Sequence, residues 1–156
     1  MSASDQAPPR YNLIDLFAGV GGLTRGFQDD SAFGDCTFEP RLMVDIDPEA
    51  RSVANQNFPD VRYLVRDVHS LSGAELRQRA GMGPKEILHV LVGGPPCQGF
   101  SWLGKRALAD ERNVCILDFL RLVKELRPLV ALIENVPLVI TVPSSHLRAD
   151  TNRQCS

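Results

Sequence analysis

An apolar run that stops abruptly at a cysteine sets the limits on how this chain folds. Residues 86–92 (EILHVLV) predict a buried strand, and residues 93–96 (GGPP) end it directly before Cys97. Glycine tolerates positive φ angles and proline fixes φ at about −65°, so the chain turns here in a constrained shape. Open α/β sheets place their reactive groups at the carboxyl ends of strands. Cys97 is therefore a candidate nucleophile.

A second interpretation of Cys97 is an ordinary buried side chain, because free cysteines usually behave as small hydrophobic residues. The flanking residues favour the turn instead, since two prolines precede Cys97 and the polar Gln98 follows it. The sequence gives no indication of a metal site. Its cysteines form no C-x-x-C pair and have no histidine at ligand spacing; they are Cys36, Cys97, Cys115 and Cys155.

Length and composition indicate one domain with a hydrophobic core. The chain has 156 residues, of which 44% are hydrophobic and 23% charged. No apolar run approaches the length of a membrane span, and the amino terminus lacks the apolar core of a signal peptide, so we expect a cytoplasmic protein with no membrane partner. The net charge of −2 gives no overall electrostatic footprint for nucleic acid. A DNA-binding surface would be local or would lie outside this chain.

Five apolar runs alternate with helical patterns, which predicts an α/β fold with a parallel sheet and right-handed crossovers. The expected strands lie within residues 11–18, 41–48, 61–65, 86–92 and 129–133. The expected helices cover about residues 23–28, 48–55, 72–80 and 113–126, the last with apolar residues at Ile116, Leu117, Leu120, Val123 and Leu126. The strand order 3-2-1-4-5 follows, with the topological switch between strands 1 and 4.

The turn after the first strand is rich in glycine. Gly19, Gly21 and Gly22 separate this strand from the start of a helix. Such a turn is a typical cradle for a nucleotide-type cofactor, because glycine lets the backbone approach the ligand and helix N–H groups point at it. Many tight strand–helix turns use glycine without any ligand, so both interpretations stay open.

Acidic residues follow three other strands. Asp45 lies about 20 residues after the glycine turn, where dinucleotide-binding folds place a carboxylate on ribose hydroxyls, and we favour this role. Asp47 is expected to cap the next helix. Asp67 either accepts a hydrogen bond from an adenine amino group or is an ordinary turn residue. Glu134 follows the fifth strand, so we expect it close to Cys97, which follows the fourth.

Two shorter signals complete the pattern. Ser72 and Glu75 form a capping box at the start of the third helix. Lys105 and Arg106 lie in a polar segment that reads as a solvated loop or as a contact to phosphates.

Together, these motifs closely resemble those of the cytosine-5 DNA methyltransferase family, in type and in order. The matching segments span residues 11–137 and are Asp15–Gly22 (DLFAGVGG), Asp45–Asp47 (DID), Asp67–Val68, Gly94–Ser101 (GPPCQGFS), Arg112–Asn113 and Glu134–Val136 (ENV). The Pro-Pro-Cys-Gln-Gly-Phe-Ser segment with a downstream Glu-Asn-Val is highly specific, whereas the single acids are not.

The resemblance implies a Rossmann-like methyltransferase fold with S-adenosyl-L-methionine as cofactor. The residues that it assigns to the cofactor are Phe17, Ala18, Gly19, Gly21 and Gly22 for the amino-acid portion, Asp45 for the ribose, Ile46 and Asp67 for the adenine, and Pro96. It further implies that Cys97 attacks C6 of a flipped cytosine in DNA and that Glu134 bonds N3 and the amino edge of that base. A thiolate nucleophile and base flipping agree with this chemistry.

The departures from the family pattern are equally informative. No Gln-x-Arg-x-Arg motif, target-recognition region or closing motif is visible, and Cys115 stands where the family usually has leucine. We therefore expect an incomplete fold: a disordered leader over residues 1–10, a partial catalytic domain over 11–137 and a divergent tail over 138–156. A second chain would then supply the missing target-recognition region.

Three functional hypotheses remain at this point. The first is a DNA cytosine-5 methyltransferase in truncated form. The second is a non-catalytic remnant or split-enzyme subunit that binds cofactor and needs a partner chain, and the third is an RNA cytosine-5 methyltransferase. The Pro-Pro-Cys-Gln turn disfavours a dehydrogenase.

Overall fold

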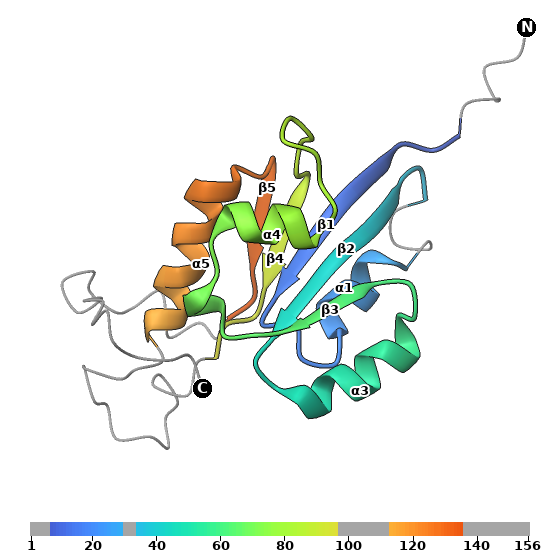
Figure 1. The fold of residues 1–156 in the computed structure, drawn as a ribbon. Helices are drawn as coiled ribbons and strands as arrows, with labels where there is room; N and C mark the ends of the chain where they lie inside the picture. Colours follow the sequence, from blue (N-terminus) through green and yellow to red (C-terminus); the bar gives the residue numbers. More distant parts are fainter. Residues whose placement is uncertain (1–6, 30–33, 97–112, 136–156) are drawn as a thin grey trace, which may run out of the picture.

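The computed structural model describes residues 7–29, 34–96 and 113–135, which form a parallel sheet with helices on both faces (Figure 1). The sheet has the order β3-β2-β1-β4-β5, and each neighbouring pair is parallel, so the predicted order is confirmed. The strands are β1 (Arg10–Leu16), β2 (Thr37–Asp45), β3 (Arg62–Val65), β4 (Val90–Gly93) and β5 (Val130–Ile133). The helices are α1 (Gly22–Phe27), α3 (Pro48–Asn57), α4 (Gly73–Arg79) and α5 (Asn113–Leu126), with a 3₁₀ turn η1 (Val68–Ser70).

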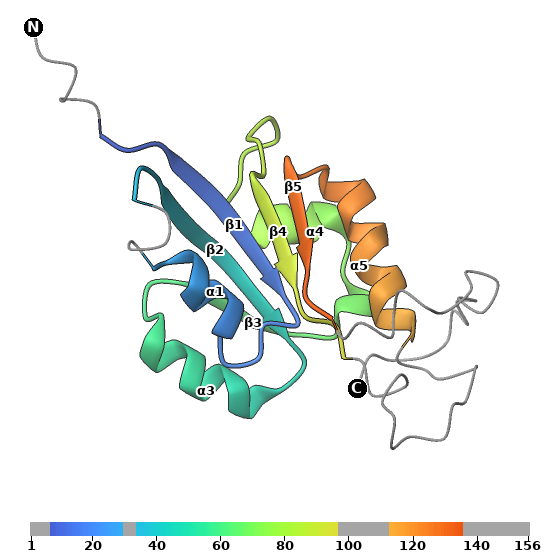
Figure 2. The same ribbon diagram turned by 180° about the vertical axis from the view of Figure 1, so that it is seen from behind.

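Helices α4 and α5 cover the face of the sheet that points to the viewer in Figure 1, whereas α1 lies on the face seen in Figure 2. Strand β1 contributes to both layers because successive side chains of a strand point to opposite faces. Ile14 and Leu16 belong to the core beneath α4 and α5, and Leu13 packs with residues of α1. Both faces of β1 are thus buried, which explains why apolar residues occupy consecutive positions at Leu13 and Ile14.

The predicted helix caps are confirmed. The side chain of Asp47 accepts a hydrogen bond from the Glu49 amide at 2.8 Å at the start of α3. The Ser72 hydroxyl accepts from the Glu75 amide at 3.2 Å at the start of α4. Both bonds satisfy amides that have no partner inside their helices.

Strand β2 starts earlier than the sequence predicted. It begins at Thr37, and the register with β1 shifts so that Leu13 is opposite Pro40 and Ile14 is opposite Leu42. Arg41 is the extra residue of a β-bulge. Pro40 lies inside the strand next to this bulge, which fits a residue that has no amide to donate to a neighbouring strand. β1 likewise begins at Arg10, the last residue of the expected leader.

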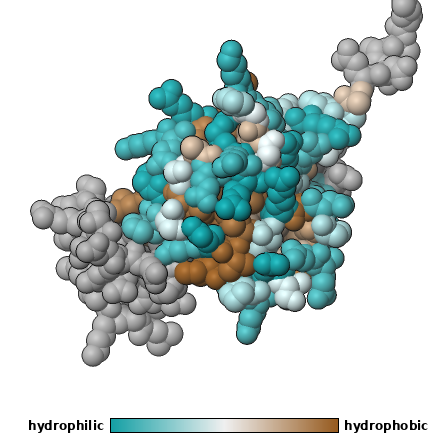
Figure 3. All heavy atoms as spheres, viewed as in Figure 1, coloured by the Kyte–Doolittle hydropathy of each residue, from teal (hydrophilic) through white to brown (hydrophobic). Residues whose placement is uncertain are grey.

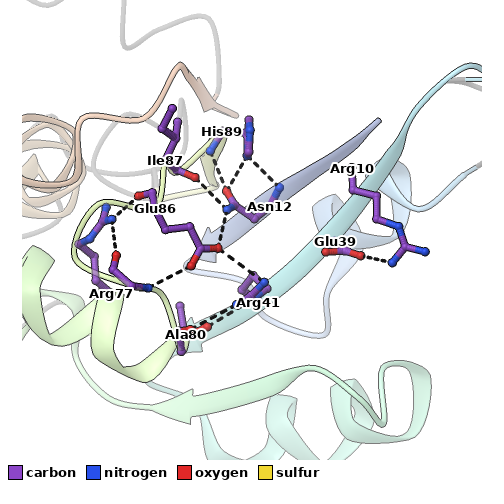
Figure 4. A network of polar contacts seen from close by, with 11 residues as sticks. Arg10, Asn12, Glu39, Arg41, Arg77, Ala80, Glu86, Ile87 and His89 are labelled. Atoms are coloured by element: carbon purple, nitrogen blue, oxygen red, sulfur yellow. Dashed lines mark hydrogen bonds and ion pairs between the residues drawn. The ribbon is translucent and has the colours of Figure 1, made fainter. Parts of the chain in front are cut away.

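Strand β4 is shorter than predicted, since only Val90–Gly93 are in the sheet. Before β4, main-chain groups of Ile87 and His89 form hydrogen bonds with the side chain of Asn12 (Figure 4). Its amide group donates to the Ile87 carbonyl at 2.8 Å, and its oxygen accepts from the His89 amide at 2.8 Å. A buried asparagine thus satisfies main-chain groups that the apolar pattern assigned to a strand.

Helix α5 has the predicted bounds and buries most of the predicted apolar face, since Ile116 and Leu126 are buried and Val123 packs against the core. Cys115, Phe119, Leu122 and Leu126 are buried at helical spacing, while Leu120 is 47% exposed. The prediction was wrong for Leu120, which is exposed, and it missed Cys115, Phe119 and Leu122.

The surface differs between the helical face and the last strand. In the view of Figure 1 the molecule is mostly hydrophilic, with a hydrophobic patch near the middle (Figure 3). Strand β5 is different, because Val130, Leu132 and Ile133 are 55%, 44% and 39% exposed. It is also an edge of the sheet within the described residues. No helix in this part of the chain is both long and apolar enough to cross a membrane.

Candidate cofactor and catalytic site

The residues predicted to bind cofactor lie where β1, β2 and β3 end. Leu16 at the end of β1 is in register with Val44 of β2 on one side and Gly93 of β4 on the other. Asp45 in turn is in register with Val65 of β3. The glycine turn, Asp45 and the turn that starts at Asp67 therefore share one edge of the sheet. Parallel strands produce this convergence because their carboxyl ends all lie at the same edge.

The turn after β1 has a strained, left-handed backbone. Phe17, Gly19 and Gly21 have φ angles of 56°, 51° and 93°. A positive φ is costly for a bulky residue such as Phe17, and strain of this kind concentrates at functional sites. Two backbone bonds hold the turn: the Ala18 amide donates to the Val44 carbonyl at 3.0 Å, and the Gly21 amide donates to the Ala18 carbonyl at 2.9 Å.

The glycines of this turn have different surroundings. A Cβ atom at Gly21 would lie 2.4 Å from the ring of Phe58 and 2.8 Å from the side chain of Met43, so no side chain fits there. A Cβ atom at Gly19 or Gly22 would have no atom within 4 Å. Gly21 is therefore required for packing, while Gly19 and Gly22 leave open space beside the backbone into which a ligand can approach.

Asp45 and Tyr63 hold Gly19 from opposite sides. The Gly19 amide donates to Asp45 Oδ2 at 2.8 Å, and the Tyr63 hydroxyl donates to the Gly19 carbonyl at 2.9 Å. The other oxygen of Asp45 accepts from the Asp47 amide at 2.9 Å. Burial raises the pKa of Tyr63 above its ordinary value, and the nearby charge of Asp45 adds to this shift. Sequence interpretation missed Tyr63, since a tyrosine in a strand reads as an ordinary β residue.

Asp15 and Thr24 form a buried pair behind the turn, a second contact that the sequence did not reveal. The Thr24 hydroxyl donates to Asp15 Oδ2 at 2.6 Å, and both residues are fully buried. Burial raises the pKa of Asp15 from 3.8 to about 6, although the hydrogen bonds with Thr24 act in the opposite direction. Asp15 Oδ1 has no hydrogen-bond partner among the described residues. The pair ties α1 to the end of β1.

The remaining adenine-side residues lie at the ends of β2 and β3. Ile46 is 41% exposed directly after β2. Asp67 begins the turn η1, where its carboxylate accepts from the His69 amide at 2.9 Å. The Arg66 amide donates to the Asp45 carbonyl at 2.9 Å and so joins the two strand ends. The two alternatives for Asp67 are compatible, because a carboxylate accepts several hydrogen bonds.

Glu134 lies beside the turn that leads to Cys97. Its amide donates to the Gly93 carbonyl at 2.9 Å, and a Cβ atom at Gly94 would lie 3.4 Å from Glu134 Oε2. The side-chain amide of Asn135 donates to the Pro95 carbonyl at 3.4 Å. The exposed Glu134 carboxylate therefore lies close to the backbone of Gly94, and Asn135 contacts the next residue, Pro95. Cys97 itself, like Lys105, Arg106 and Arg112, lies outside the described residues.

A hollow of about 570 Å³ is found elsewhere, beside β3 and the end of α4. Its lining contains none of the predicted site residues and consists of Leu42, Arg62, Tyr63, Leu64, Gln78 and Arg79. The predicted cofactor residues are thus brought together by the convergence of strand ends and do not line this hollow.

Comparison with known proteins decides the family. The profile of the C-5 cytosine-specific DNA methylases matches residues 11–153. The chain belongs to this family. The type II methyltransferase M.XorII of Xanthomonas oryzae pv. oryzae is 43% identical over 123 residues, which are 79% of this chain and 27% of that protein.

Two further relatives extend the comparison. The type II methyltransferase M1.HphI of Haemophilus parahaemolyticus is 37% identical over 144 residues, which are 90% of this chain and 36% of that protein. The crystal structure of a DNA modification methyltransferase encoded within an E. coli prophage has a TM-score of 0.71 at 35% identity and covers 90% of this chain and 36% of its own. The predicted methyltransferase fold is confirmed, and this cytosine-5 methylase chain spans about a third of the length of these relatives.

Family and fold imply S-adenosyl-L-methionine as cofactor, and the residues at the strand ends fit it. Gly19 and Gly22 leave open space beside the backbone. The Asp45 carboxylate can accept further hydrogen bonds beyond the two from Gly19 and Asp47. Ile46 offers an exposed apolar side chain next to these polar groups. An apolar surface with a few convergent polar groups is typical of a cofactor site.

Proposed function

We propose that this chain carries the cofactor site and the catalytic thiol of a DNA (cytosine-5-)-methyltransferase. The observation that supports this most strongly is the position of Glu134 beside Gly94, directly after the strand that pairs with the one leading to Cys97. Family membership supplies the chemistry that such a thiol–carboxylate pair performs. The activity and the DNA substrate are proposals, since the chain spans only part of its relatives.

In this proposal the cofactor lies across the ends of β1, β2 and β3. Asp45 binds the ribose hydroxyls, Ile46 packs on the adenine, and Asp67 accepts from its amino group. The segment from Phe17 to Gly22 holds the amino-acid portion, and Pro96 closes the side toward the catalytic turn. When bound, S-adenosyl-L-methionine supplies the methyl group.

The chain's own residues then activate the cytosine. The Cys97 thiolate attacks C6 of a base flipped out of the duplex, since C6 is inaccessible inside it. As the S–C6 bond forms, ring electrons move toward C5 and N3, and the Glu134 carboxyl group donates a proton to N3, which neutralises the negative charge that develops there. C5 takes the methyl group, then loses its proton to a base, and the electrons of that C–H bond expel the thiolate and restore the ring.

DNA with 5-fluorocytosine tests the role of Cys97. Fluorine at C5 blocks the loss of the proton, so the covalent adduct persists and is visible on a denaturing gel. The full chain is co-expressed with the part of M.XorII beyond the matched 123 residues. We expect an adduct with the wild type and with Cys36→Ser, but not with Cys97→Ser. An adduct that persists in Cys97→Ser would exclude this residue as the nucleophile.

Glu134→Gln tests the carboxylate in the same complex. Removing one stabilising group of this kind typically lowers kcat by about 10²–10³. We expect a loss of that size in the transfer of labelled methyl groups, with cofactor binding unchanged. Wild-type kcat in Glu134→Gln would contradict the role assigned to Glu134.

We also propose that a second polypeptide, which supplies the target-recognition region, docks on β5. The support is the exposure of Val130, Leu132 and Ile133 on a strand that is an edge of the sheet within the described residues. Exposed apolar edge strands are uncommon in isolated proteins because they invite pairing. In the co-expressed complex we expect Leu132→Lys to reduce co-purification, whereas Val53→Lys on α3, which is 45% exposed in the wild type, leaves it intact. Equal recovery of both variants would contradict this docking surface.

A further inference from the structure

A single arginine of α5 contacts the turn η1 at three backbone carbonyls. Arg121 Nη1 donates to the carbonyl of Leu71 at 2.9 Å. Its Nη2 donates to the carbonyls of Val68 and His69 at 3.3 and 3.4 Å. These carbonyls belong to the segment that directly follows Asp67. Arg121 therefore fixes the backbone next to the residue assigned to the adenine.

Two carboxylates of α5 hold Arg121 in place. Asp118 Oδ1 accepts from Arg121 Nε at 3.1 Å, and Glu125 Oε1 accepts from Nη1 at 2.9 Å. The side chain of Asp118 is only 6% exposed. The other oxygen of Glu125 accepts from the Gly73 amide at 2.6 Å, at the start of α4. Two side chains of α5 thus hold the guanidinium group of Arg121 in the position from which it contacts η1.

His69 extends these contacts to the Asp67 carboxylate. The His69 Nδ1 atom lies 2.8 Å from Asp118 Oδ2. The backbone amide of His69 donates to Asp67 Oδ1 at 2.9 Å. Asp118 and Asp67 therefore hold the same residue from two sides, and the position of the Asp67 carboxylate depends on α5.

We propose that Arg121 and Asp118 are positioning residues that hold Asp67 where it accepts a hydrogen bond from the 6-amino group of adenine. This inference rests on the proposed function, in which Asp67 binds that edge of the cofactor. Arginine suits the role because its rigid planar fork presents five N–H donors, whereas lysine offers a mobile point charge. A site built to bond one particular N–H group rejects an analogue that lacks it, provided that the acceptor is held in place.

The experiment compares two ligands on the full chain by calorimetry: S-adenosyl-L-homocysteine and S-inosyl-L-homocysteine, in which a carbonyl replaces the 6-amino group. For the wild type we expect the adenosyl compound to bind about tenfold more tightly, the effect of one hydrogen bond to a charged group. In Arg121→Lys we expect the ratio to fall to about twofold, because the acceptor loses its fixed position. Lys124→Gln, exposed on the same helix, is expected to keep the wild-type ratio.

The ratio separates positioning from stability. If Arg121→Lys weakens binding of both ligands equally and keeps the wild-type ratio, Arg121 serves only stability and the inference is overturned. If Arg121→Lys does not fold, as judged by circular dichroism, Asp118→Asn replaces it in the same test. We expect the ratio of the two affinities to fall to about twofold in this variant as well. A wild type that binds neither ligand, or binds both equally, refutes the proposed role of Asp67 instead.

Discussion

The two sides of the sheet's carboxyl edge are built differently. At the end of β1, Gly19 is held through its amide by Asp45 and through its carbonyl by Tyr63. Met43 and Phe58, which are 1% and 5% exposed, pack beneath this turn. The geometry of the cofactor side is therefore fixed by contacts within the described part of this chain.

At the end of β4 and β5 the register is fixed but the side chains are not enclosed. Gly93 is in register with Ile133, and this pairing brings Glu134 beside Gly94. Glu134 is nevertheless exposed, as are Val130 and Leu132. The contrast teaches that local contacts hold the turn after β1 in place, whereas the described side chains at the end of β5 are open to solvent.

Truncating one apolar side chain on each side gives the largest expected difference. Phe58→Ala removes a buried ring beneath the glycine turn and is expected to lower the free energy of unfolding by about 3–5 kcal/mol. Leu132→Ala on β5 is expected to lower it by less than about 1 kcal/mol, because that side chain is already 44% exposed. Urea denaturation of the full chain measures both. Similar losses for the two variants would contradict the contrast between the two sides of this edge.

A pair of glycine variants sharpens the description of the cofactor side. Gly21→Ala combines a positive φ with a Cβ that would overlap Phe58 and Met43, so we expect a loss of about 2–4 kcal/mol. Gly22→Ala places its methyl group in open space and is expected to change stability by less than about 0.5 kcal/mol. Equal effects in thermal unfolding would show that the turn is not packed as described.

The pH dependence of stability tests the buried Asp15. Its pKa rises from 3.8 to about 6 on folding, so between these values the folded state binds a proton that the unfolded state lacks. The contribution of Asp15 to the free energy of unfolding therefore falls as pH rises from about 4 to about 6, by about 2–3 kcal/mol. Asp15→Asn is expected to lose this slope, whereas the exposed Asp60→Asn keeps it. An unchanged slope in Asp15→Asn would place the Asp15 carboxyl in a more polar setting.

Much of the fold followed from local signals. Strand order came from the alternation of apolar runs and helices, and the caps at Asp47 and Ser72 came from short motifs that act within a few residues. The errors arose where distant residues intervened. Asn12 satisfies the backbone of residues 87–89 from another strand, and the bulge at Arg41 depends on pairing with β1. Contacts of this kind leave no pattern in the segment that they change.

In the candidate site, too, local signals predicted some residues and contacts between distant residues could not be predicted. The residues at strand ends could be predicted because topology alone brings Gly19, Asp45 and Glu134 to one edge. The supporting contacts of Tyr63, Thr24 and Arg121 could not, because each reaches a partner through a side chain whose direction the sequence does not specify. The role of Cys97 stays a prediction, since it lies outside the described residues.

The most direct test of the account is calorimetric titration of the full chain with S-adenosyl-L-homocysteine. We predict measurable binding to the wild type, about tenfold weaker binding to Asp45→Ala because a charged acceptor for the ribose is lost, and near wild-type binding to Asp47→Ala, whose side chain only caps α3. Wild-type affinity in Asp45→Ala, or no binding to the wild-type chain, would contradict the account.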